Sequence, residues 1–169
     1  MPSGPDHPSK SVTHVLLADR VFDGYRWHTE AAVAIRDGRV ATIGPANEVT
    51  AGWPKTRLPV GSFLAPGFID LQVNGGGDVL FNDSPTPEAI SRIAAAHRKF
   101  GTTGFLPTLI TDTSEKMHAA IAAVRSAMRT EPTVLGLHLE GPFLSPEQAG
   151  VHALASTTIS LLRFSTEKR

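Results

Sequence analysis

The chain has 169 residues, of which 41% are hydrophobic and 19% are charged, so it is globular material long enough for one sizeable core. Its 16 Lys and Arg residues balance 16 Asp and Glu residues, which removes any electrostatic case for a nucleic-acid partner or an anionic membrane. Because cysteine is absent, disulfides and thiolate metal sites are excluded, and a metal would need His, carboxylate or amide ligands.

The first segment, residues 1–11, is rich in Pro and Ser and has no apolar core of a signal peptide. It is interpreted as a disordered leader. No apolar run in the chain approaches the length of a transmembrane helix, so a cytoplasmic protein is expected.

Residues 12–62 are expected to form a small antiparallel β-sheet with one face on a core. Val15–Phe22 and Ala31–Ile35 are short apolar segments. The Asp37-Gly38 pair that follows predicts a hairpin, because type I′ turns need positive φ at both central residues.

The pattern changes at Phe63. In the segment 68–74, apolar residues alternate with Asp70, Gln72 and Asn74. A polar row on one face of a strand needs a reason, and lining a site would supply one.

Two helices and a strand are predicted next. Thr86 fits a helix N-cap and Pro87 fits the first helical position. Thr102–Ile110 has the character of a strand, and Asp112 with Glu115 resembles the capping box of a second helix.

The last predicted strand begins at Val134 and is ended by Gly141-Pro142, and it places His138 and Glu140 on one face. Glu140 then lies at a carboxyl strand end, where the loops of parallel α/β folds form their cleft. Glu140 is therefore either a site residue or an ordinary carboxylate that caps a loop or pairs with a cation. The order strand, helix, strand, helix, strand predicts a parallel sheet, either doubly wound or the opening of a (β/α)₈ barrel.

Three motifs resemble the N-acetylglucosamine-6-phosphate deacetylases, a branch of the amidohydrolase superfamily. They are residues 65–77, residues 101–108, and the run 138–144 followed by Gly150-Val151-His152. The resemblance covers residues 12–152. It implies an α/β fold in which a small β half-sandwich (12–62) precedes the first three βα units (63–152) of a metal-dependent (β/α)₈ barrel that is incomplete.

Most amidohydrolases have His-x-His on the first barrel strand, whereas this chain has Gln72 and Asn74. That substitution is typical of the deacetylase branch and argues against the dihydroorotase and urease-like branches.

The resemblance implies roles for individual residues. Glu140 would be the carboxylate ligand of one divalent metal ion, zinc, iron or manganese, which would polarise the acetyl carbonyl and lower the pKa of its bound water. His152 and the backbone of Val151 would contact the substrate, and Gln72 and Asn74 would lie near the metal.

The implied reaction is hydrolysis of N-acetylglucosamine 6-phosphate to glucosamine 6-phosphate and acetate, in a family whose members are commonly homodimers. Family members have two histidine metal ligands and the aspartate acting as general base and acid further along the chain, and a complete barrel takes about 250 residues. Residues 153–169 depart from the family pattern, which suggests a truncated or frameshifted product or a partial gene model. The chain alone is therefore expected to be an inactive fragment, and the alternatives are a non-catalytic fragment, one piece of a split enzyme, or another N-acyl amino-sugar deacetylase.

Overall fold

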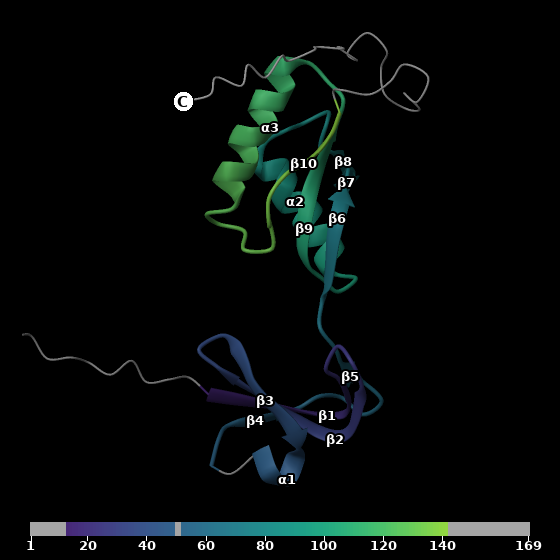
Figure 1. Cartoon of the computed structure of the whole chain (residues 1–169), viewed down its shortest axis with the longest axis vertical. Coiled ribbons are helices and arrows are strands. Elements are labelled where there is room, and N and C mark those ends of the chain that lie inside the picture. The colour runs from purple at the N-terminus through teal and green to yellow at the C-terminus, as the bar shows by residue number, and fades with distance from the viewer. Residues whose placement is uncertain (1–12, 50–51, 142–169) are drawn as a thin grey trace, which may run out of the picture. The chain divides into compact units, whose positions relative to one another are not determined.

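The computed structural model describes residues 13–49 and 52–141 (Figure 1). The chain divides into two compact units, Met1–Pro66 and Gly67–Arg169. Within the described ranges, no helix has the length and apolar character needed to cross a membrane.

The first unit is a five-stranded sheet with one short helix. Its elements are β1 (Thr13–Phe22), β2 (Trp27–Arg36), β3 (Arg39–Pro45), α1 (Ala46–Val49), β4 (Lys55–Arg57) and β5 (Phe63–Leu64). The strand order is β3-β2-β1-β4, and β5 also pairs with β1. The expected antiparallel pairing holds for β1, β2 and β3, but β4 and β5 both pair with β1 in parallel, so the sheet is mixed.

The hairpin predicted between β2 and β3 is confirmed, because Asp37 and Gly38 have φ angles of 51° and 72°. The prediction of a single buried face is wrong. Four consecutive β2 residues, Ala31–Ala34, are buried, since each face of the sheet contributes to its own apolar cluster. One of these clusters includes Val49 and Trp53, which pack on it.

The second unit alternates strands and helices. Its elements are β6 (Phe68–Val73), β7 (Gly75–Gly76), β8 (Val79–Leu80), α2 (Pro87–Arg98), β9 (Thr102–Ile110), α3 (Ser114–Ala127) and β10 (His138–Glu140). Strands β6, β9 and β10 form a parallel sheet in the order β10-β9-β6, and β7 pairs with β8 as a separate hairpin. The predicted parallel sheet is present, and its three strands do not close into a barrel within the described residues (Figure 1).

Helix α2 begins as predicted, with the Thr86 hydroxyl accepting from the Ala89 N–H and Pro87 in the first turn. The start of α3 differs by one residue from the prediction. Its N-cap is Thr113, whose side chain accepts from the Lys116 N–H.

The core of the second unit joins both helices to the sheet. Side chains from β6, β9, α2, α3 and the segment after β8 form one apolar cluster, whose largest fully buried members are Phe81, Phe105, Ile90, Ile93 and Leu109. Burial of these side chains is the main force that holds the helices on the sheet.

The last strand is shorter than expected, because the predicted strand began at Val134. Only His138–Glu140 forms β10, and Val134 contributes an isolated bridge to Phe105. The backbone of Phe105 bonds to Thr133 and Leu135, so the chain touches β9 at two separate places.

Candidate active site

Two of the polar residues predicted from the sequence, Gln72 and Glu140, meet at one edge of the parallel sheet. Because β6, β9 and β10 run in the same direction, their carboxyl ends lie at the same edge. Gln72 lies near the end of β6 and Glu140 at the end of β10.

Gln72 and Glu140 are in direct contact. Gln72 Nε2 donates a hydrogen bond to Glu140 Oε2 at 2.9 Å, although the residues are 68 positions apart in the chain. His138, on the same strand as Glu140, has its Nδ1 atom 2.9 Å from the Leu71 carbonyl oxygen. Since β9 lies between β6 and β10, these two contacts join strands that are not neighbours in the sheet.

The end of β6 is fixed by a side chain that sequence reasoning did not single out. The β6–β9 register shifts between Asp70 and Val73, and the Val73 N–H donates to Thr108 Oγ1 at 3.0 Å. Thr108 is fully buried, and its hydroxyl lies 3.3 Å from the Leu106 carbonyl oxygen. The sequence feature that could have indicated this contact is the hydroxyl of Thr108, which stands among apolar residues of the segment 102–110.

Asn74 follows β6 and leads into the glycine segment. Its carbonyl accepts from the Phe81 N–H at 2.8 Å, which closes the β7–β8 hairpin back on the end of β6. His97 of α2 lies beneath this hairpin, with Nε2 2.9 Å from the Gly75 carbonyl oxygen. Gly76 is required by close approach, because a Cβ there would lie 2.9 Å from the His97 ring.

The backbone at Glu140 is also held. Its carbonyl accepts from Thr111 Oγ1 at 3.1 Å. Gly141 follows with φ of 108°, a conformation that favours glycine, and a Cβ there would overlap the Thr111 hydroxyl. The chain therefore turns immediately after the carboxylate.

The side chains at this edge of the sheet include some of the ligand types that a divalent metal needs. A carboxylate beside an amide and an imidazole suits a hard or borderline cation. Catalytic zinc sites use three protein ligands, and residues 13–49 and 52–141 contain no group of three His, Asp or Glu that would hold a metal. Glu140 thus fits as one ligand of such an ion, but the described part of the chain does not complete the set. Val151 and His152 lie outside the described residues.

The family model of the Amidohydrolase family matches residues 63–169. The chain belongs to the amidohydrolase family. The matched range contains the parallel sheet and the Gln72–Glu140 contact.

Individual relatives narrow the likeness within the family. The chain is 44% identical over 145 residues to an N-acetylgalactosamine-6-phosphate deacetylase of Shewanella sp. (strain ANA-3), covering 82% of this chain and 36% of the relative. It is 37% identical over 142 residues to an N-acetylglucosamine-6-phosphate deacetylase of Haemophilus influenzae, covering 83% of this chain and 37% of the relative. The crystal structure of N-acetylglucosamine-6-phosphate deacetylase from Pasteurella multocida matches with a TM-score of 0.80 and 31% identity, covering 86% of this chain and 38% of that chain.

The resemblance seen in the three sequence motifs is therefore confirmed, and it concerns the N-terminal portion of these deacetylases. The chain spans a little over a third of the length of the Shewanella and Haemophilus influenzae relatives.

Proposed function

We propose that this chain is the N-terminal part of a metal-dependent deacetylase that hydrolyses the N-acetyl group of N-acetylglucosamine 6-phosphate. The products are glucosamine 6-phosphate and acetate. The observation that supports this most directly is the contact between Gln72 and Glu140, at the strand ends where an amidohydrolase site is expected. In the proposed architecture the first unit is part of a β half-sandwich, and the second supplies the first three βα units of a (β/α)₈ barrel.

Glu140 is the proposed metal ligand, and Gln72 positions it. The Gln72 amide donates to one carboxylate oxygen and so restricts rotation of the carboxylate. Asn74 is proposed to lie near the metal, and Val151 and His152 are proposed to contact the sugar and the amide carbonyl. When bound, zinc, iron or manganese supplies the Lewis-acid polarisation and the activated water that amide hydrolysis needs.

The 169-residue chain by itself is expected to release no acetate. The described residues contain no group of three His, Asp or Glu that could hold a metal ion, and a catalytic metal usually needs three protein ligands. Metal-dependent turnover by the purified chain would contradict this part of the proposal.

The proposal is tested with a hybrid enzyme. Residues 13–141 replace the matching N-terminal portion of the Haemophilus influenzae deacetylase, and acetate release from N-acetylglucosamine 6-phosphate is measured. The hybrid is expected to turn over, and Glu140→Gln is expected to abolish turnover. Glu88→Gln, an exposed acid on α2, is the matched control and is expected to retain it. A folded hybrid without activity, or an active Glu140→Gln hybrid, would refute the proposal.

A second substrate is favoured by one observation, the 44% identity to an N-acetylgalactosamine-6-phosphate deacetylase. The two sugars differ in the configuration of one hydroxyl. Comparing kcat/KM of the hybrid for the two 6-phosphates shows whether residues 13–141 contribute to the choice between them. If the hybrid prefers the same sugar as the Haemophilus influenzae enzyme that supplies its C-terminal portion, sugar specificity is determined outside residues 13–141.

A further inference from the structure

Phe81 and Asn82, which follow the β7–β8 hairpin, connect the carboxyl ends of β6 and β9. The Phe81 N–H donates to the Asn74 carbonyl at 2.8 Å, and the Phe81 side chain is fully buried in the core. The next residue, Asn82, directs its side chain to the end of β9.

The Asn82 side-chain amide pairs with the Ile110 backbone as the backbone of a neighbouring strand would. Its Oδ1 accepts from the Ile110 N–H at 3.0 Å, and its Nδ2 donates to the Ile110 carbonyl at 3.2 Å. Pairing between β6 and β9 ends at Val73 and Pro107, so Ile110 lies beyond the reach of β6. The amide therefore satisfies backbone groups that would otherwise end the ladder unpaired.

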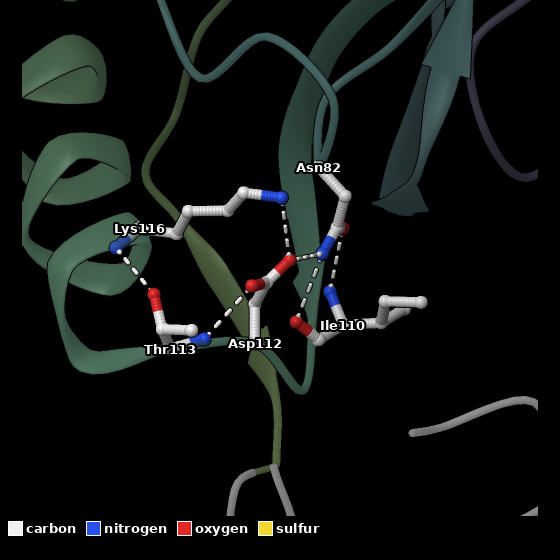
Figure 2. A network of polar contacts seen from close by, with 5 residues as sticks. All are labelled: Asn82, Ile110, Asp112, Thr113 and Lys116. Atoms are coloured by element: carbon white, nitrogen blue, oxygen red, sulfur yellow. Dashed lines mark hydrogen bonds and ion pairs between the residues drawn. The ribbon is translucent and has the colours of Figure 1, made fainter. Parts of the chain in front are cut away.

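Asp112 and Lys116 fix the orientation of this amide (Figure 2). Asn82 Nδ2 and Lys116 Nζ both donate to Asp112 Oδ2, at 3.2 and 3.0 Å. Burial alone raises the pKa of Asp112, but the hydrogen bonds from Thr113, Lys116 and Asn82 outweigh burial and hold the pKa below its usual range. The carboxylate stays charged at neutral pH, so only the NH₂ side of Asn82 can face it.

The other side of the β9 end holds Glu140. Ile110 is the Cα partner of Glu140 in the β9–β10 register, and Thr111 Oγ1 donates to the Glu140 carbonyl. A displacement of Ile110 would therefore displace Glu140 relative to Gln72.

We infer that Asn82 is a positioning residue for the candidate active site, setting the distance between Gln72 on β6 and Glu140 on β10. It acts through the Ile110 backbone, with which its side-chain amide makes two hydrogen bonds. Its relevance to catalysis rests on the proposed function, whereas its effect on the Gln72–Glu140 contact does not.

The test uses NMR of the 169-residue chain, without metal or substrate. In Asn82→Ala, exchange of the Gln72 side-chain amide hydrogens with solvent is expected to rise about tenfold, as loss of one net hydrogen bond implies. The backbone amide of Leu109, in the core of β9, is expected to exchange as in the unaltered chain. Asp83→Ala changes the adjacent exposed residue and is expected to leave Gln72 unchanged.

Two further variants separate positioning from general destabilisation. Asn82→Asp keeps the side-chain shape and the acceptor for the Ile110 N–H. It removes the NH₂ donor and places a second carboxylate beside Asp112. Protection of the Gln72 side-chain amide from exchange is therefore expected to be lost in this variant, which serves as the test if Asn82→Ala does not fold. Combining Asn82→Asp with Asp112→Asn reverses the hydrogen bond, so that the amide at position 112 donates to the carboxylate at position 82. Part of the protection of the Gln72 side-chain amide is then expected to return.

Unchanged Gln72 exchange in both Asn82 variants would overturn the inference, as would equal losses at Gln72 and Leu109 with no recovery in the double variant. An inactive hybrid enzyme with these NMR results intact would count against the proposed function alone.

Discussion

Replacing Thr108 by Val tests how the end of β6 is held. Val has nearly the same shape as Thr, so the substitution removes the hydroxyl that accepts from the Val73 N–H without opening a cavity. Both residues are buried, with Thr108 at 0% and Val73 at 3% exposure, so water does not replace the lost acceptor. An unsatisfied buried donor costs about 1–3 kcal/mol in the free energy of unfolding.

The assay is urea unfolding of the second unit. Both tryptophans, Trp27 and Trp53, belong to the first unit, so their fluorescence does not report on Thr108. The far-ultraviolet circular dichroism of α2 and α3 does, and the fluorescence serves as an internal control. Thr103→Val on the same strand is the matched variant, because Thr103 is exposed and its hydroxyl is 3.5 Å from the Phe68 carbonyl.

Thr103→Val is expected to change the free energy of unfolding by less than about 0.5 kcal/mol. Equal effects of the two substitutions on the free energy of unfolding would refute the view that the Thr108 hydroxyl supplies the acceptor for the Val73 N–H where the β6–β9 register shifts.

Three further predictions concern other contacts. Phe81→Ala empties a fully buried site and is expected to cost about 3–5 kcal/mol in the same circular dichroism assay; a loss near zero would show that Phe81 does not anchor the hairpin. Gly76→Ala brings a Cβ against the His97 ring, so its cost to stability should fall when His97→Ala is added, and strictly additive costs would contradict the contact. The hydrogen bond from His28, with two backbone N–H groups, holds the pKa of Asp23 below its ordinary 3.8. The loss of stability in Asp23→Asn should therefore be full above pH 3.8 and should vanish as the pH falls through the lowered pKa of the folded state. Tryptophan fluorescence can follow this trend, and a loss that does not depend on pH would contradict it.

Local signals were enough to predict the two helices and the three parallel strands of the second unit, but not the β7–β8 hairpin. Thr86 before Pro87 marked the start of α2, and the polar row on β6 marked the strand end at which Gln72 meets Glu140. These features depend on residues close in sequence, so pattern and capping chemistry determine them.

The parts that sequence reasoning missed depend on contacts between distant segments. Asn82 pairs with Ile110 across 28 positions and Thr108 with Val73 across 35, and no local periodicity marks such side-chain to backbone bonds. The parallel pairing of β4 with β1 was also missed. All three residues of β4 are exposed, so the sequence of β4 shows no alternation of buried and exposed residues.

The central claim, that Glu140 is a ligand of a divalent metal, is tested most directly by the metal content of the purified hybrid enzyme. One equivalent of zinc, iron or manganese is expected in the hybrid and in its Glu88→Gln variant, and a large loss is expected in Glu140→Gln. A folded Glu140→Gln hybrid that keeps a full equivalent of metal would contradict the claim.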